Sequence, residues 1–144
     1  TAASNQIAPE YDNLPTNMQQ IALWHKQPNG LHRLHQKMHQ LCLWLEQEQK
    51  ALAVQQEQAQ KALGLMNAQE LLLCQEEAHT RTQTMHNVMN RLNRLLEALA
   101  VFIRQRMELE KNLYGHHFQV LKQHTEKLRV LHLVFTQRIQ ALSV

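Results

Sequence analysis

The fold of this chain is decided by residues 31–52, LHRLHQKMHQLCLWLEQEQKAL. Their apolar side chains recur at alternating steps of three and four, which places them on one face of a helix. Such a heptad pattern is typical of helices that pack along a seam, so we expect a helix over about residues 31–63. We interpret the seam as a surface for a partner or for self-association; it comprises Leu31, Leu34, Met38, Leu41, Trp44, Leu45 and Leu52.

The sequence before this stretch predicts a tail and a short helix. Residues 1–15 are polar and irregular, which is typical of a flexible tail. Thr16 and Gln19 have the spacing of a capping box and would start a helix over about residues 16–27. Pro28 would end that helix, because proline cannot continue the hydrogen-bond ladder.

Two later breaks separate long helical patterns. Gly64 is expected to end the helix of residues 31–63 as a left-handed cap, and Asn67 with Glu70 would start the next. That helix would cover about residues 67–113, and another would cover about 116–143. Gly115 lies between the last two, and a glycine costs only about 1 kcal/mol within a helix. The sequence therefore leaves open whether they are one continuous helix.

The helical pattern of residues 67–113 has a wide apolar stripe, which indicates contact with more than one neighbour. The 144 residues include only three Gly and three Pro, so few and long elements are expected. We predict an all-α single domain over residues 16–143, an elongated antiparallel helical bundle or coiled coil of about three long helices plus the short one. The core or second interface is predicted to comprise Met85, Met89, Leu92, Leu96, Leu99, Ile103, Leu121, Leu128, Leu131 and Phe135.

One part of the seam resembles a known repeat. The arrangement Leu34…Leu41-x-x-Trp44-Leu45 is similar to the first helix of a spectrin-type repeat, and residues 31–142 are about as long as one such repeat. The middle helix here is longer than in such a repeat, and the third lacks the expected core tryptophan. The resemblance implies a spacer or docking unit.

The charge is unevenly distributed along the chain. The net charge is +3; residues 1–80 hold five basic and eight acidic side chains (−3), and residues 81–144 hold ten basic and four acidic ones (+6). The basic half could form a face for nucleic acid or anionic lipid. Its basic residues are spaced singly, which favours an acidic helix with Glu46, Glu48 and Glu57 packed beside a basic one that carries Arg91, Arg94, Arg104 and Arg106.

Cysteine use and hydropathy bear on the cellular setting. Cys42 and Cys74 are the only cysteines, too few for a disulfide-stapled secreted domain, so we expect a reducing, cytoplasmic environment. The longest apolar stretch, around residues 95–103, is interrupted by Glu97 and is much too short to cross a bilayer.

Histidine is unusually frequent, with ten copies. His32, His35 and His39 share one helical stripe, and His116 and His117 adjoin the possible bend. Because histidine titrates near neutral pH, these five are candidates for pH-sensitive association. No acidic residue completes a metal signature beside them, so neither a metal site nor a cofactor is predicted.

Catalytic signatures are missing from the sequence. It contains no Gly-rich phosphate loop, GxSxG, HExxH or CxxC, so we expect a protein that is not an enzyme. The leading hypothesis is a protein–protein interaction or scaffold module that binds partners through helix faces and forms a homo-oligomer, with a dimer favoured. One alternative is a regulatory, autoinhibitory domain of a larger signalling or trafficking protein. The other is a basic bundle that binds anionic lipid or nucleic acid.

Overall fold

The computed structural model describes residues 13–113 and 115–142, except for the side chains of His116 and His117. Within these ranges the chain forms helices α2 (Met18–Lys26), α3 (Gly30–Lys61), α4 (Ala68–Lys111) and α5 (His116–Gln140), and no strand. The predicted all-α bundle is confirmed, and the observed helix ends differ from the predicted ones by at most three residues. Residues 1–12 of the predicted tail lie outside the described residues.

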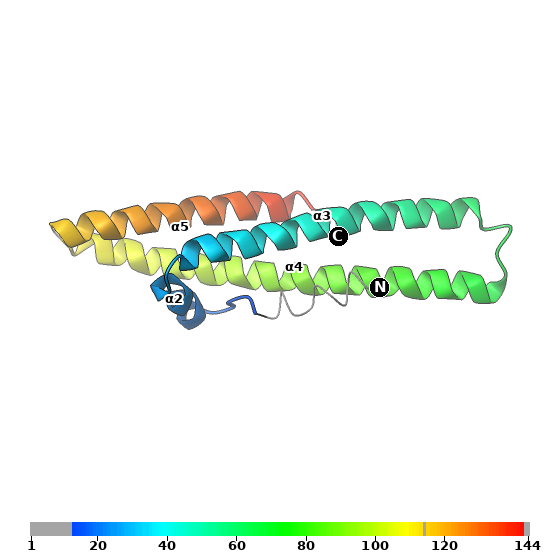
Figure 1. Cartoon of the computed structure of the whole chain (residues 1–144), viewed down its shortest axis with the longest axis horizontal. Helices are drawn as coiled ribbons and strands as arrows, with labels where there is room; N and C mark the ends of the chain where they lie inside the picture. The colour runs from blue at the N-terminus through cyan, green and yellow to red at the C-terminus, as the bar shows by residue number, and fades with distance from the viewer. Residues whose placement is uncertain (1–12, 114, 143–144) are drawn as a thin grey trace.

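The helices form an elongated bundle whose parts differ in thickness (Figure 1). α3 and α4 make a long antiparallel hairpin, and α5 returns antiparallel to α4 so that it also contacts α3. α2 packs against α3 and α4 near the start of α3. With 44 residues and a rise of 1.5 Å per residue, α4 is about 66 Å long and runs the length of the molecule.

Asparagine side chains start two of the helices. Asn17 accepts a hydrogen bond from the Gln20 backbone amide at 2.9 Å, so α2 begins one residue later than the predicted Thr16–Gln19 capping box. The Gln20 side chain accepts from the backbone amide of Thr16, the residue before the cap, at 2.7 Å. Asn67 caps α4 as predicted, because it accepts from the Glu70 amide at 2.8 Å.

The two glycines at helix ends behave differently from each other. The prediction of a left-handed cap at Gly64 was wrong: Gly115 is the only described glycine with a positive φ. The amide of Ala62 bonds to Gln58 instead, so α3 ends without a residue in the left-handed region. Gly115 has φ 88°, which α-helical backbone does not permit, and it separates α4 from α5. The last two helices are therefore not continuous.

The core contains apolar residues from all four helices. The structure also brings Leu14 and Pro15 into the folded region, although the sequence pattern placed them in the tail. Leu14 packs with Ile21 of α2 and the seam of α3 against the wide stripe of α4. The fully buried side chains include Leu34, Met38, Leu41, Leu45, Met85, Val88, Leu92, Leu95, Leu99, Leu128 and Phe135.

Burial stops abruptly part-way along the α3–α4 hairpin. Residues 49–84 are all described, and none of their side chains is buried. This segment, which we call the arm, consists of the end of α3, the connection and the first part of α4. α5 does not reach it, and no other described helix packs on it (Figure 1). The molecule is therefore a helical bundle at one end and a two-helix hairpin at the other.

A buried ion pair lies where the bundle meets the arm. Arg81 Nε donates to Glu48 Oε2 at 2.9 Å, and the side chain of Glu48 is only 5% exposed. Arg81 also donates through Nη1 to Gln55 at 2.9 Å. The pair joins α3 to α4 at one place and so fixes the register of the hairpin. A buried carboxylate without its partner would be strongly unfavourable.

Removal of one member of this pair should destabilise the chain more than removal of both. We expect Arg81→Met to lower the free energy of unfolding by about 3 kcal/mol, and Glu48→Met with Arg81→Met to recover most of that loss. Chemical denaturation of the single and double variants measures this. Glu57→Met at the exposed pair with Lys61 is the control and should change stability by less than about 1 kcal/mol. Equal losses in the single and double Arg81 variants would contradict the assignment.

The two cysteines differ in environment. Burial raises the pKa of the Cys42 thiol to about 11, with Glu46 adding to the rise and Arg138 opposing it. Cys74 is only half-buried, on the arm. Since the thiolate is the reactive form, Cys42 is an inert core residue under ordinary conditions.

Alkylation should therefore distinguish the two thiols. With iodoacetamide at pH 8 we expect Cys74 to react at least about tenfold faster than Cys42, because a raised pKa and burial both suppress thiolate attack. Peptide mass spectrometry over a time course measures the two rates. The rates should converge in denaturant; comparable rates in the native chain would show that Cys42 is not held in the core.

Candidate functional site

The residues predicted as an association seam lie mostly inside this chain. The middle of the seam is buried against α4 and belongs to the core cluster, and Leu31, Trp44 and Leu52 at its margins are half-buried. The residues predicted as core or second interface are also internal: Met85, Leu92, Leu96, Leu99, Ile103, Leu121, Leu128, Leu131 and Phe135 are buried, and Met89 is half-buried. Surfaces for partners must be sought among the apolar residues that the chain leaves exposed.

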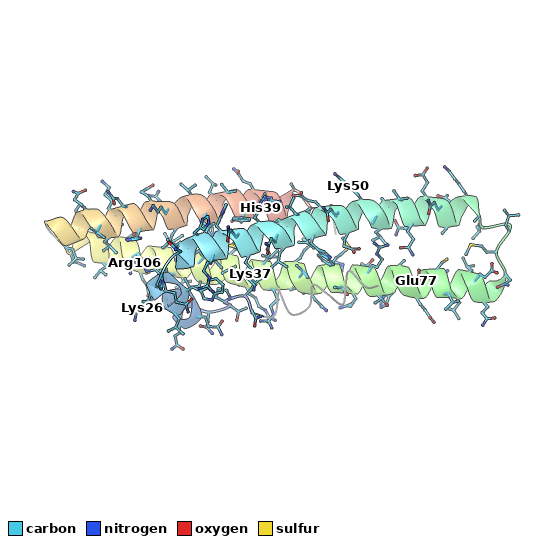
Figure 2. The ribbon with its side chains drawn as sticks, viewed as in Figure 1. Lys26, Lys37, His39, Lys50, Glu77 and Arg106 are labelled. Carbon is cyan, nitrogen blue, oxygen red and sulfur yellow. The ribbon has the colours of Figure 1, made fainter. Side chains whose placement is uncertain are left out.

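The first such surface is the arm. An open groove of about 780 Å³ runs along one side of it between Ala51, Val54 and Ala59 on α3 and Cys74 and Glu77 on α4. We call this the arm groove; Figure 2 labels Glu77 opposite the end of α3. Within the described part of the chain, contacts between its two helices support the arm here, such as the hydrogen bond from Gln55 to Glu77 at 3.4 Å.

The tip of the arm concentrates exposed leucines. Leu63 and Leu65 lie in the connection between the helices, and Leu72 and Leu73 follow in the first turns of α4. Leu65 is 89% exposed, and the other three are each more than half exposed. Single exposed apolar residues are ordinary, but four within eleven residues form an unusual surface for a monomer.

The second exposed apolar surface is a stripe on α5. Val130 and Val134, one helical turn apart, are exposed together with Leu133, and Val120 is exposed further toward the start of the helix. We call these four residues the α5 stripe. They face away from the core residues Leu128, Leu131 and Phe135 of the same helix.

The predicted histidine stripe on α3 remains at the surface. His32, His35 and His39 are exposed. His39 Nδ1 lies 2.8 Å from Arg138 Nη1, and Arg138 Nη2 donates to Glu46 at 3.1 Å, so His39 is part of a contact between α3 and α5. α5 begins at His116, but the side chains of His116 and His117 lie outside the described part of the chain.

The sequence pattern missed a contact between histidines of different helices. His25 of α2 and His124 of α5 contact each other edge to face, with ring centroids 5.2 Å apart. His25 also packs on Phe102 of α4, and the guanidinium of Arg106 lies 5.6 Å from the centroid of the Phe102 ring. Burial, with the charge of Arg106 and the neighbouring His124, lowers the pKa of His25 to about 4. Because His25 and His124 are about 100 residues apart in the sequence, no periodic pattern indicated their contact.

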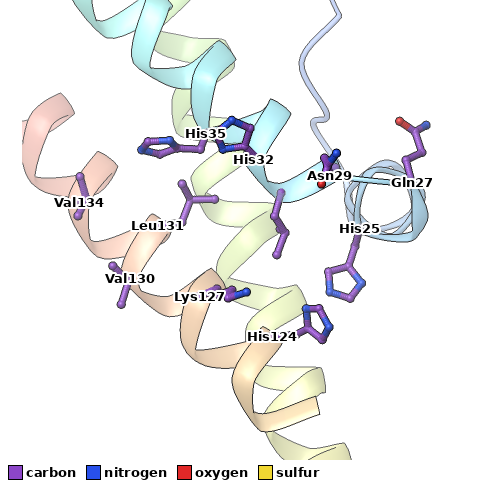
Figure 3. Close-up of a pocket in the computed structure, with 12 residues that line it drawn as sticks. His25, Gln27, Asn29, His32, His35, His124, Lys127, Val130, Leu131 and Val134 are labelled. Carbon is purple, nitrogen blue, oxygen red and sulfur yellow. The ribbon is translucent and has the colours of Figure 1, made fainter. Parts of the chain in front are cut away.

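A cavity of about 510 Å³ lies beside this contact, between α2, α3 and α5 (Figure 3). We call it the histidine cavity. Figure 3 shows His25 and His124 on one side and His32 and His35 on another, with Lys127 between them. Its lining comprises His25, Gln27, Asn29, Gly30, Leu31, His32, His35, His124, Lys127, Val130, Leu131 and Val134.

The described residues offer neither a metal site nor a membrane span. Within residues 13–113 and 115–142, no three His, Cys, Asp or Glu side chains lie where they could share a metal ion. In the same part of the chain, no helix combines the length and the apolar character that crossing a bilayer requires.

The lowered pKa of His25 predicts a specific loss of stability in acid. The folded chain holds His25 neutral, whereas the unfolded chain protonates it near pH 6.5. The stability that depends on neutral His25 is therefore complete above pH 6.5 and is lost as the pH falls toward 4. Between pH 7.5 and 5 we expect the free energy of unfolding of His25→Gln to fall by about 1 kcal/mol less than that of the native chain. This figure allows for the partial exposure of His25. Urea denaturation at both pH values measures this. The exposed His86→Gln should behave as native; if His25→Gln did too, His25 would not be the titrating group.

Comparison with known proteins adds no relative to this description. The chain matches no protein-family model, no curated protein and no solved structure. The arm, the α5 stripe and the histidine cavity therefore have to be interpreted from their own geometry and chemistry.

Proposed function

We propose that this chain is a non-catalytic protein-interaction module that forms a dimer through its arm and offers its α5 stripe to protein partners. The observation that carries the proposal is that no side chain in residues 49–84 is buried, although the same two helices enclose a dense core a few turns away. Helical surfaces that are left without cover in one chain are typical of sites where another helix packs.

The arm groove is suited to a helix. Its floor contains small and medium side chains, including Ala51, Val54 and Ala59, which let a second helix approach closely. Packing there would convert a two-helix hairpin into a bundle of three or more helices. Bundles of that kind bury apolar faces that a two-helix hairpin leaves exposed to solvent.

A second copy of the chain is the occupant that the charges favour. The arm has three basic and four acidic residues, a net charge of −1, so two arms would not repel each other strongly. Side-by-side arms related by a two-fold axis would bring the same surface of each copy together, the commonest arrangement of homodimers. The charged residues of the arm are Lys50, Glu57, Lys61, Glu70, Glu76, Glu77 and Arg81.

Several basic side chains are already engaged within the chain, which supports protein partners over nucleic acid. Arg81 and Arg138 are paired with Glu48 and Glu46, and Arg106 lies over Phe102. Binding to a polyanion depends on many free cations at once. We further propose an intracellular, reducing setting, in which the two free thiols stay reduced.

A variant in the arm groove tests the dimer. We expect sedimentation velocity to show a dimer of the native chain at micromolar concentration, and Val54→Asp to raise its dissociation constant at least about tenfold, because a charge would be buried in an apolar contact. Val54 is 51% exposed in the monomer, so the substitution should leave the helix content unchanged by circular dichroism.

The matched control is Gln56→Asp. Gln56 is an exposed residue of the same helix that does not line the arm groove, and its replacement by Asp adds the same charge as Val54→Asp. Its dimer affinity should stay within about twofold of the native value. A native chain that is still monomeric at about 100 µM would contradict the proposal, and so would equal effects of the two substitutions.

A further inference from the structure

The lining of the histidine cavity combines polar and apolar side chains. The polar ones are imidazoles from three helices, the ammonium group of Lys127 and the amide groups of Gln27 and Asn29. The apolar ones include Leu31, Val130 and Val134. A volume of about 510 Å³ falls within the range of small-molecule sites, which are mostly apolar with a few convergent polar groups.

Two ring nitrogens at this cavity lack partners. Nε2 of His25 and Nδ1 of His124 are buried and make no hydrogen bond within the described part of the chain. Buried polar atoms are almost always hydrogen-bonded, so each exception calls for an explanation. Both rings border the cavity (Figure 3), but as the side chains stand these two nitrogens are shielded from it, so a ligand oxygen would reach them only after one of the rings turns.

The charge at the cavity is one-sided. No carboxylate is among its lining residues, and Lys127 contributes a full positive charge. The nearest acidic residue in sequence, Glu126, is bound to Arg129 at 2.7 Å. The first turn of α3, which also lines the cavity, has no acidic residue and no side-chain cap, so its partial positive charge is not neutralised locally.

We propose that the histidine cavity binds a small amphipathic organic anion, a carboxylate on a short hydrocarbon body. The carboxylate lies toward Lys127 and the His25–His124 contact, where it accepts charge-assisted hydrogen bonds. The hydrocarbon lies along Leu31, Val130 and Val134, part of which would otherwise remain exposed. The α5 stripe thus shares Val130 and Val134 with this site.

A series of ligands of equal length and different charge tests the site in the native chain. We expect octanoate to bind saturably with one site per chain and a dissociation constant of about 1 mM or lower by isothermal titration calorimetry. Octanol and octylammonium should bind at least about tenfold more weakly, since they lack the anion, and acetate should show no saturation because it lacks the hydrocarbon.

Two matched substitutions on α5 locate the site. Lys127→Gln should weaken octanoate binding about tenfold, whereas Lys122→Gln, which removes the same charge from an exposed position outside the cavity, should leave it within about twofold. Both lysines are exposed, so neither substitution should disturb the fold. His124→Phe, which keeps the ring and removes its nitrogens, should also weaken binding.

Three results would overturn the inference. The first is no saturable octanoate binding to the native chain up to about 10 mM, a concentration at which even a weak specific site would fill. The second is equal affinity for octanoate, octanol and octylammonium, which would mean adsorption to exposed apolar surface. The third is equal affinity of the Lys127→Gln and Lys122→Gln variants, which would place the anion elsewhere.

Discussion

The organisation of this molecule depends on a mismatch of length between α4 and the helices that cover it. α4 has 44 residues, whereas α3 has 32 and α5 has 25. Since a helix can shield a neighbour only along its own length, the second half of α4 acquires several neighbours and its first half acquires one. The dense core, the abrupt end of burial at Glu48 and Met85, and the exposed leucines at the tip all follow from that difference.

Charge pairing reinforces the same arrangement. The sequence pattern suggested an acidic helix beside a basic one, and two arginines outside the set that it named, Arg81 and Arg138, bind acidic residues of α3. Glu48 meets Arg81 across the hairpin, and Glu46 meets Arg138 across the α3–α5 contact. Side chains on facing helices are brought together by register, which net charge per segment does not contain. The composition could therefore predict attraction between the segments but not its partners.

Hydrophobic periodicity was enough to predict the helices and the all-α class, because it reports which residues share a face. It could not report which neighbour covers that face, so Leu34, Met38, Leu41 and Leu45 read equally well as an external seam or as an internal one. The same limit explains the histidines. His32, His35 and His39 stood out because they lie close in sequence, whereas His25 and His124 meet only after α2 and α5 have packed. Local chemistry found Asn67 as a cap and missed Asn17 by one position.

The arm contributes little to the core and has no part in holding α2 or α5. Its length is therefore free to vary as a spacer. Removal of seven residues from each of its two helices would shorten it by about 10 Å. The apolar seam would stay on the same face, because seven residues make about two turns of helix. Evolution could change the distance between the tip and the bundle in such steps without altering the residues that pack in the bundle.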